Sequence, residues 1–314
     1  MKFKKIYNVM ILLPFLFSCG GSNGGESPVS TKSFSVPEEI VSPEFRRCLE
    51  SQAKLYHWRA NQDVRKITCE AESDRGEYEF GITTLQGIHV FENLEELDFD
   101  GSGGIDGKIR DISPVSSLAR LKVLRVRQNY IESFEALREM SSLEELYITQ
   151  TAFSDLSPIA SLENLKKLSL VGSELYVDQI VNFEVLKNLS NLEELDLSGQ
   201  HYNLVNNGGL TFLEGLPGLK KFNFTRTFIK DFDGLQYLVN LEELVLHGGE
   251  TFYVDIIEAN YERLSELKKL KRLVWTGAGY SNNIEFLGNY SELESLVLTG
   301  VSFYERKDKQ KAIG

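Results

Sequence analysis

The sequence reads LKVLRV at residues 121–126, LEELYI at 143–148 and LKKLSL at 165–170, three copies of one pattern. The pattern Leu-x-x-Leu-x-Leu occurs nine times, with an aromatic or β-branched residue replacing a later leucine in some copies. The copies begin at Leu94, Leu121, Leu143, Leu165, Leu192, Leu219, Leu241, Leu270 and Leu293, in steps of 27, 22, 22, 27, 27, 22, 29 and 23 residues. Steps in this range are typical of a stacked repeat, in which each unit buries its apolar side only against its neighbours.

The segments between the copies carry apolar residues every third position, as in Ile131, Phe134 and Leu137. This spacing predicts a tight 3₁₀-like or extended return rather than a full α-helix. The Ser-Pro pairs at 113–114 and 157–158 fit the start of a helical turn, where proline needs no N–H partner and we expect the serine hydroxyl to cap a free amide. The sequence therefore predicts an α/β solenoid of parallel strands and compact returns.

The stretch 121–170 resembles the bacterial internalin-like leucine-rich repeats of 22 residues, and the resemblance extends over residues 64–303. It implies a horseshoe with a parallel β-sheet on the concave face and short 3₁₀ or extended returns on the convex face. The family usually has Asn eight residues after the first leucine, where its amide bonds the backbone of adjacent rungs. Here Asn129 is the one Asn among these positions. Since Gly249, Ala278 and Val301 cannot replace that bond, we expect looser C-terminal rungs.

Residues 1–18 have the features of a bacterial lipoprotein signal peptide. Three lysines precede an apolar run at 6–17 that is too short to span a bilayer. The sequence Leu16-Phe17-Ser18-Cys19 resembles a lipobox, which implies cleavage before Cys19 and a diacylglycerol on its thiol. The alternative is an ordinary secretory signal with an incidental cysteine. Residues 19–36 are predicted to form a lipidated flexible tether. Gly20 fits sorting to the outer membrane, if the host is Gram-negative.

The two remaining cysteines lie ahead of the regular repeats. Cys48 falls on a predicted helix at 43–54, and Cys69 ends a degenerate copy of the strand pattern. Because an exported compartment permits disulfides, we expect the pair to bridge, with two reduced buried thiols as the alternative. The predicted organisation is a helical, disulfide-stapled N-terminal cap at 37–80, a leucine-rich repeat domain at 81–303 and a frayed charged tail at 304–314.

The net charge of the chain limits the classes of partner that it could bind. The chain carries a net charge of −12, and removal of the three N-terminal lysines leaves 31 basic and 46 acidic residues, or −15. An acidic chain of this kind is a poor candidate for binding nucleic acid. No nucleophile triad, phosphate loop or His-rich cluster is evident, so we expect neither an enzyme nor a cofactor. The expected form is a monomer that binds a protein partner and reaches the membrane through its N-terminal acyl anchor.

One segment resembles the first nine positions of an EF-hand calcium loop. Its oxygen-bearing side chains are those of Asp98, Asp100, Ser102 and Asp106. The twelfth position is Ile109, where the calcium loop needs Glu, and no pair of flanking helices is expected. The favoured interpretation is a Gly-rich insertion with solvated aspartates, so no metal site is predicted.

The outward positions of the strand pattern form rows along the predicted sheet. The first row alternates strictly between Glu and Lys, from Glu95 to Glu294, which predicts ion-pair ladders that hold register. Candidate partner-binding residues fall into a charged and aromatic group, an aliphatic stripe and a rim of aromatic insertions. They are Arg125, Arg127 and Tyr147; Val245, Val274 and Val297; and Tyr202, Phe252 and Tyr253. The alternative for the valines is β-propensity alone, and for the first group an ordinary polar surface.

These features predict a lipid-anchored protein–protein interaction module of the bacterial cell envelope, which binds through its concave face and insertion rim. One alternative is a glycan-binding surface protein that stacks sugars on Tyr202, Phe252 and Tyr253. A further alternative is a regulatory subunit of an envelope enzyme, since fold does not fix function.

Overall fold

The computed structural model describes residues 33–69, 81–101, 108–149, 151, 155–172, 180, 182–200, 208–227, 232–247, 261–281 and 285–303. The chain divides into two units, Met1–Ser33 and Phe34–Gly314, and the architecture below belongs to the second unit. Among the described residues, no helix combines the length and the apolar character needed to cross a bilayer.

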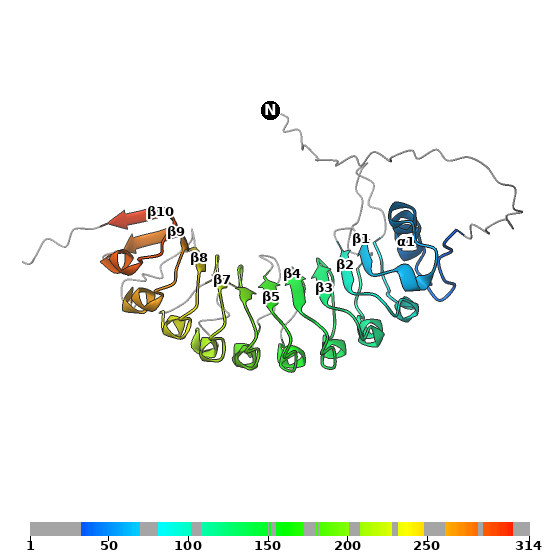
Figure 1. The fold of residues 1–314 in the computed structure, drawn as a ribbon, viewed down its shortest axis with the longest axis horizontal. Helices are drawn as coiled ribbons and strands as arrows, with labels where there is room; N and C mark the ends of the chain where they lie inside the picture. Colours follow the sequence, from blue (N-terminus) through cyan, green and yellow to red (C-terminus); the bar gives the residue numbers. More distant parts are fainter. Residues whose placement is uncertain are drawn as a thin grey trace, which may run out of the picture. The chain divides into compact units, whose positions relative to one another are not determined.

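A single parallel sheet runs through this unit, with its strands in sequence order along one side of the stacked rungs (Figure 1). Strands β2 to β10 contain the nine copies of the leucine pattern, and β1 contains the degenerate copy before them. The strands are β1 (Lys66–Cys69), β2 (Glu96–Asp100), β3 (Val123–Arg127), β4 (Glu145–Thr149), β5 (Lys167–Val171), β6 (Glu194–Asp196), β7 (Lys221–Asn223), β8 (Glu243–His247), β9 (Arg272–Ser281) and β10 (Ser295–Phe303). The predicted parallel solenoid is therefore confirmed.

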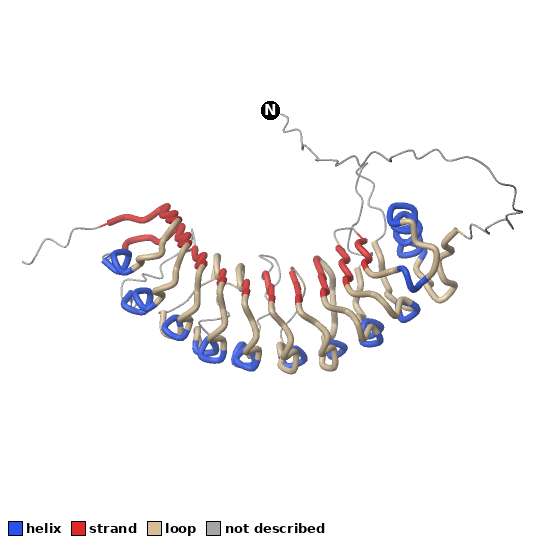
Figure 2. The backbone as a smooth tube through the Cα atoms, in the orientation of Figure 1, coloured by secondary structure: helices blue, strands red, loops and turns tan. Residues whose placement is uncertain are grey.

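The return segments form short 3₁₀ turns on the outer side of the rungs, as Figure 2 shows. The turns are η1 (Asn61–Asp63), η2 (Ile88–Val90), η3 (Ser113–Ser117), η4 (Glu135–Leu137), η5 (Ser157–Ile159), η6 (Phe183–Asn188), η7 (Thr211–Gly215), η8 (Leu235–Tyr237), η10 (Tyr261–Glu266) and η11 (Glu285–Asn289). Apolar side chains three positions apart fall on one side of such a turn, which faces the sheet. Phe134 and Leu137 are both buried in this way, as the sequence predicted.

Register between the strands keeps each leucine position in a column that crosses the rungs. Leu97 pairs with Leu124, and Leu124 pairs with Leu146. All three side chains are fully buried, and the intervening residues of each strand point away from the core. This alternation follows from the two-residue period of a strand. The result is one continuous core made of thin layers, each dependent on the layers beside it.

The two Ser-Pro turns begin differently from the predicted serine cap. Ser113 and Ser157 are the first residues of η3 and η5, with no capping bond from either hydroxyl to a turn amide. The cap is instead the aspartate two residues earlier. Oδ1 of Asp111 accepts the N–H of Ser113 at 2.7 Å, and Oδ1 of Asp155 accepts the N–H of Ser157 at 2.9 Å. A carboxylate is a stronger acceptor than a hydroxyl for a free amide, which explains why an aspartate rather than a serine caps each turn.

The N-terminal end of the sheet is closed by helix α1 (Pro43–Tyr56). Oγ of Ser42 accepts the N–H of Phe45, and Pro43 occupies the first helical turn, where its missing N–H has no cost. Phe45, Leu49 and Ala53 lie four residues apart and bury one face of the helix. A disulfide joins Cys48 to Cys69 at the end of β1, as predicted. The first rung is thereby covered by a helix that is covalently tied to it.

Polar side chains link successive rungs at both ends of the strands. At the position where the internalin-like repeats carry Asn, the buried side chains of Asn129, Gln200 and Thr227 bond backbone groups one rung earlier, at Ile109, Leu170 and Leu197. A second series, which the sequence analysis did not identify, precedes the first leucine of the pattern. Its amides donate to the preceding rung in the pairs Asn93–Gln62, Asn164–Ser141, Asn191–Glu163 and Asn240–Pro217, at 2.8 to 3.0 Å.

Gly234 provides a direct test of how closely the rungs approach. Its backbone has φ of +111°, and an added Cβ would lie 2.2 Å from the carbonyl oxygen of Leu210 on the preceding rung. We predict that Gly234→Ala lowers the free energy of unfolding by about 2–3 kcal/mol, because strain and the backbone clash add. Gly288→Ala is the control, since nothing lies within 4 Å of its Cβ position and its φ is not positive. Urea titration measures both variants, and an unchanged midpoint for Gly234→Ala would contradict this account.

Candidate interaction surface

The first two outward rows of the sheet form ion pairs between neighbouring strands. In both rows a basic residue pairs with a glutamate of a neighbouring strand, which is the preceding strand in every pair except Lys66–Glu96. The pairs are Lys122–Glu95, Lys166–Glu144, Lys220–Glu193 and Lys271–Glu242 in the first row, and Lys66–Glu96, Lys167–Glu145, Lys221–Glu194 and Arg272–Glu243 in the second, at 2.7 to 3.2 Å. The predicted ladders are thus present, and their exposure makes each pair a weak stabiliser.

The lysines of the first row change the titration of their glutamates. The hydrogen bond from Lys166 and its positive charge hold the pKa of Glu144 below its ordinary value. The bond from Lys220 lowers the pKa of Glu193 in the same way, and the bond from Lys271 lowers that of Glu242. These carboxylates therefore stay charged to lower pH than free glutamates do, and their neighbours neutralise them. Such residues leave little free charge for attracting a ligand.

Arg125 is the centre of a tighter cluster on β2 to β4. Its guanidinium bonds Glu96 of the preceding strand, lies 3.4 Å from Glu145 of the next, and stacks over the ring of Tyr147 at 4.8 Å from the centroid. The hydroxyl of Tyr147 donates to Glu145 at 3.0 Å. Burial, and then this bond to a carboxylate, raise the pKa of Tyr147. The structure brings Arg125 and Tyr147 together as the sequence suggested, but the charge of Arg125 is compensated within the chain.

Arg127 lies one row further along the strand and contacts the first two aspartates of the calcium-like segment. Its guanidinium is 2.9 Å from Asp98 and 3.8 Å from Asp100. A cationic side chain thus occupies the position that a metal would share with these carboxylates. Ser102 and Asp106 lie outside the described residues. Within the described residues, no group of three His, Cys, Asp or Glu side chains is arranged to hold a metal ion.

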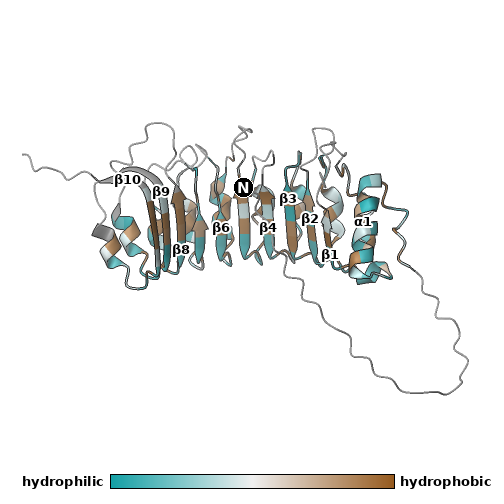
Figure 3. Cartoon of the chain, turned by 90° about the horizontal axis from the view of Figure 1, so that it is seen from above, coloured by the Kyte–Doolittle hydropathy of each residue, from teal (hydrophilic) through white to brown (hydrophobic). Residues whose placement is uncertain are grey.

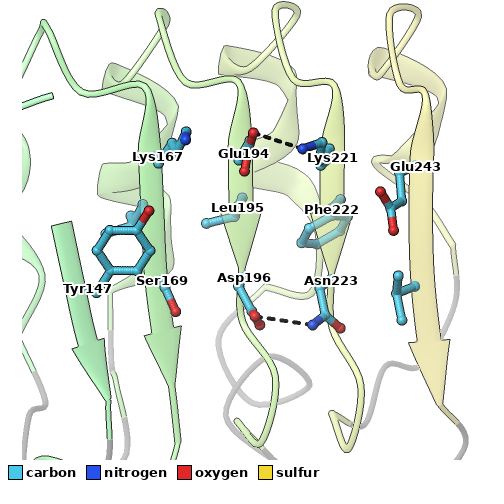
Figure 4. A pocket seen from close by; sticks show the side chains of 12 residues that line it. Tyr147, Lys167, Ser169, Glu194, Leu195, Asp196, Lys221, Phe222, Asn223 and Glu243 are labelled. Atoms are coloured by element: carbon cyan, nitrogen blue, oxygen red, sulfur yellow. Dashed lines mark hydrogen bonds and ion pairs between the residues drawn. The ribbon is translucent and has the colours of Figure 1, made fainter. Parts of the chain in front are cut away.

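A groove opens at the middle of the sheet, over strands β4 to β8 (Figure 4). Its volume is about 250 Å³. Tyr147 forms one wall and Val245 lies at the other end, so the charged and aromatic group and the aliphatic stripe each contribute one member to the same depression. Between Tyr147 and Val245, the equivalent outward position of each strand carries a smaller or shorter side chain. These are Ser169, Asp196 and Asn223, with Lys167, Glu194, Lys221 and Glu243 along the upper edge.

The floor of the groove depends on local side-chain bonds that end strands β6 and β7 after three residues each. Oδ1 of Asp196 accepts the N–H of Ser198 at 2.8 Å, and Oδ1 of Asn223 accepts the N–H of Thr225 at 3.1 Å. Such side-chain bonds to the residue two positions on compete with regular strand structure. Strands β6 and β7 accordingly have three residues, whereas β2 to β5 have five.

Asp196 differs in its partners from Asp98, the carboxylate at the equivalent position of β2. It bonds the neutral amide of Asn223 at 3.1 Å and the backbone of Ser198, and no described basic side chain forms an ion pair with it. Asp98, at the equivalent position of β2, faces Arg127 instead. Asp196 therefore brings into the centre of the groove a carboxylate that forms no ion pair with any described basic side chain. A basic group of a ligand would form an ion pair with this carboxylate.

The aliphatic stripe continues from the groove toward the C-terminal end of the sheet. Val245 pairs with Val274, and Val274 pairs with Val297. In Figure 3 the hydrophobic colouring is stronger along β8 and β9 than along the central strands. Val245 and Val274 are half-buried and Val297 is 37% exposed. The three predicted valines thus form a contiguous apolar strip beside the polar groove.

The remaining predicted residues could not be placed. Tyr202, Phe252 and Tyr253 lie outside the described residues, as does Cys19. Sequence reasoning in turn did not select Ser169, Asp196 or Asn223, although it placed them on the outward row. The signal that could have found the last two is the motif Asp-x-Ser at 196–198 and Asn-x-Thr at 223–225, which predicts a local side-chain turn.

Comparison with solved structures places this fold among known proteins. An internalin C2 from Listeria monocytogenes aligns with a TM-score of 0.53 at 25% identity, over 68% of this chain and 82% of the internalin chain. An internalin (InlF) from the same species aligns with a TM-score of 0.51 over 83% of each chain; its identity of 20% is evidence for the fold alone. The chain is a leucine-rich repeat protein.

Curated relatives of this leucine-rich repeat protein are distant. Human "Leucine-rich repeat-containing protein 56" is 26% identical over 200 residues, which are 64% of this chain and 32% of the relative. The Arabidopsis thaliana "Protein phosphatase 1 regulatory inhibitor subunit PPP1R7 homolog" is 33% identical over 122 residues, 38% of this chain and 34% of the relative. The chain thus spans about a third of the length of these relatives. No protein-family model matches the sequence.

The Arg125 cluster of this leucine-rich repeat protein yields a test by titration. Partial burial raises the pKa of Glu96, but the bonds and charges of Lys66 and Arg125 outweigh it and keep this pKa below its ordinary value. Because the pKa is lowered in the folded state, the stabilisation is complete above the ordinary carboxyl pKa and is lost as pH falls through the lowered value.

We predict that Arg125→Met raises the pKa of Glu96, as measured by carboxyl carbon NMR during an acid titration. Arg138→Met is the matched control. It removes the partner of Glu135, whose pKa the Arg138 bond lowers, and should raise the pKa of Glu135 while leaving Glu96 unchanged. An unchanged Glu96 in Arg125→Met would show that Lys66 alone sets its titration.

Proposed function

We propose that this chain is a lipid-anchored protein–protein interaction module of the bacterial cell envelope. In this proposal it captures a partner in the central groove and along the adjoining valine strip. Leucine-rich repeat proteins generally act in protein–protein interaction, and solenoids offer extended concave surfaces for this purpose. The observation that carries the proposal is the position of Asp196, an unneutralised carboxylate at the centre of the groove.

The groove has the composition of a binding site for a basic side chain of a protein. A lysine or arginine placed in it would meet the carboxylate of Asp196, and its aliphatic stem would pack against the neighbouring side chains that line the groove. The flanking ladders are already paired, so they contribute shape and exclude water rather than attract charge. The apolar strip that follows supplies area for contact beyond the groove.

The proposed location rests on the N-terminal sequence together with the disulfide. A basic start, a short apolar run and Cys19 form a lipobox-like segment. The Cys48–Cys69 disulfide fits a protein exported to an oxidising compartment. An acyl anchor on Cys19 and the flexible tether would hold the module at the membrane surface while leaving the groove accessible.

A regulatory subunit of an envelope enzyme remains an alternative within the same proposal. The name of one relative describes such a role for that relative, as a homologue of a phosphatase regulatory inhibitor subunit. A regulatory role would use the same protein-binding surface, so identification of the captured partner separates the two.

The anchor is tested by Cys19→Ala. We expect the unchanged chain to incorporate radiolabelled palmitate and to fractionate with membranes, because diacylglycerol attaches through this thiol. The variant should lose the label and appear in the soluble fraction. Cys48→Ala with Cys69→Ala is the control, since it removes the other two cysteines, which form the disulfide, and leaves Cys19 in place. Label on Cys19→Ala would contradict lipidation at this residue.

The groove is tested with a photo-crosslinking residue in place of Ser169, on the floor between Tyr147 and Asp196. Irradiation of envelope extracts should give one dominant covalent product with a second protein. Asp196→Asn keeps the local turn but removes the charge, and we expect it to reduce this product about tenfold, since a charge-assisted bond contributes about 1.5–3 kcal/mol. Glu163→Gln, on an exposed convex turn, should leave the yield unchanged. Equal yields from both variants would exclude Asp196 as the recognition residue.

A further inference from the structure

The second series of asparagines is interrupted at one rung. Directly before the first leucine of their rungs, Asn191 and Asn240 each donate to a carbonyl of the preceding rung, at Glu163 and Pro217. The rung between them carries Gly218 at this position, the one glycine among the nine equivalent residues. One side chain is therefore missing from a row in which both neighbouring rungs have one.

The missing side chain leaves a backbone acceptor open. In the pairs of this series the acceptor is the carbonyl two residues before the first core position of the preceding rung. At the interruption that carbonyl belongs to Ser190, and a Cβ on Gly218 would lie 3.6 Å from its oxygen. Among the described residues, no hydrogen bond reaches this oxygen. Because a backbone carbonyl is a strong acceptor, it is satisfied here by solvent or by a ligand.

A polar pocket lies over this gap, just ahead of strands β6 to β9, and is called the Gly218 pocket below. Its volume is about 430 Å³, within the range of roughly 300–1,000 Å³ that is usual for small-molecule sites. Every side chain that lines it is polar or charged, and Gly218 contributes backbone alone. It shares no lining residue with the groove over β4 to β8, so it is a separate feature of the described surface.

Two glutamates of the Gly218 pocket are already neutralised. Glu193 pairs with Lys220 and Glu242 pairs with Lys271, both at 2.9 Å. Carboxylates accept hydrogen bonds and do not donate them. Together with the carbonyl of Ser190, these two side chains supply acceptors to the pocket and add little net negative charge.

Lys269 is a cation of the same pocket that forms no ion pair with a described residue. Its Nζ donates to the neutral Oδ1 of Asn240 at 2.7 Å. An ammonium group has three N–H donors, so two remain for a ligand. A charge-assisted bond to an anionic group is stronger than one between neutral groups, so Lys269 favours a ligand with an acidic group.

The chemistry of the pocket selects a ligand rich in hydroxyl groups. A hydroxyl both donates and accepts, so it matches a lining in which carbonyl, amide and carboxylate oxygens stand beside ammonium groups. An apolar ligand would remove these groups from water and return no hydrogen bonds. A saccharide unit offers several hydroxyls on a rigid ring, and an acidic saccharide adds the anionic group that Lys269 favours.

We propose that the Gly218 pocket binds an acidic saccharide unit that carries a carboxylate, such as a uronic acid. Hydroxyl groups of the sugar donate to the carbonyl oxygen of Ser190 and to the amide oxygen of Asn191, and the carboxylate binds Nζ of Lys269. This site uses none of the aromatic residues on which the sequence suggested sugar stacking. It goes beyond the proposed capture of a protein in the central groove and does not depend on it.

The test is an NMR titration of the purified full chain with glucuronate, and with glucose as the neutral comparison. We expect glucuronate to bind with a dissociation constant on the order of millimolar, since the ligand is small and the site is open. Glucose should bind about tenfold more weakly, because it lacks the charge-assisted bond. Lys269→Met should reduce glucuronate binding to the level of glucose. Lys268→Met is the matched control, because Lys268 is exposed and does not line the pocket.

A second variant, Gly218→Asn, fills the gap with the side chain that the neighbouring rungs carry. The new amide should donate to the carbonyl of Ser190 and weaken glucuronate binding at least about tenfold, without lowering the urea midpoint. The Cβ contacts at Gly218 are of ordinary length and its φ is not positive, so the variant is expected to fold. Gly288→Asn is the control, because nothing lies within 4 Å of its Cβ position and it does not line the pocket.

The proposal is overturned if the unchanged chain does not bind glucuronate, or binds glucose equally well. It is also overturned if a folded Gly218→Asn chain binds glucuronate as strongly as the Gly288→Asn control does. Asp196→Asn should leave glucuronate binding unchanged, since Asp196 lines the groove and not this pocket. The sugar titration and the crosslinking test of the groove therefore succeed or fail independently.

Discussion

The fold depends on apolar burial between rungs, because no rung can shield its own leucines. Each unit contributes one strand and one short turn, and its side chains face the units on either side rather than a second layer of its own. The register that places Leu97, Leu124 and Leu146 in one column is therefore a condition for folding. The rung-to-rung bonds of Asn129, Gln200 and Thr227 satisfy backbone groups that this close stacking would otherwise bury without partners.

The same constraint separates structural from recognition residues on the outward face. Strands about 4.8 Å apart place equivalent residues side by side, so every row becomes either a series of attractive pairs or a series of repulsive ones. In the Glu/Lys rows, neighbouring residues attract and neutralise one another. Arg125 and Arg127 are likewise compensated by carboxylates of neighbouring strands. The proposed recognition positions are those outside these ion pairs, namely Asp196 in the groove and the apolar strip ending at Val297.

A linear stack also has two ends, and each exposes a layer of core. The α1 cap and its disulfide cover the first layer. At the other end, β10 is the last strand among the described residues, and its core leucine Leu296 is 44% exposed.

The periodic leucines by themselves determined the solenoid, because a repeated apolar pattern permits one stacked arrangement of strands and returns. The alternation of Glu and Lys determined the ladders for the same reason, since their spacing repeats with the rungs. The predicted bridge between Cys48 and Cys69 also followed from sequence, through the degenerate strand copy at 64–69. The groove could not be predicted in this way. It arises where the side chains of Asp196 and Asn223 accept the N–H two residues further on and so shorten β6 and β7. The ring of Tyr147 is fixed by stacking with Arg125 of another rung. Whether a charge remains free depends on which side chains meet across rungs 22 to 29 residues apart, and only the tertiary structure decides that.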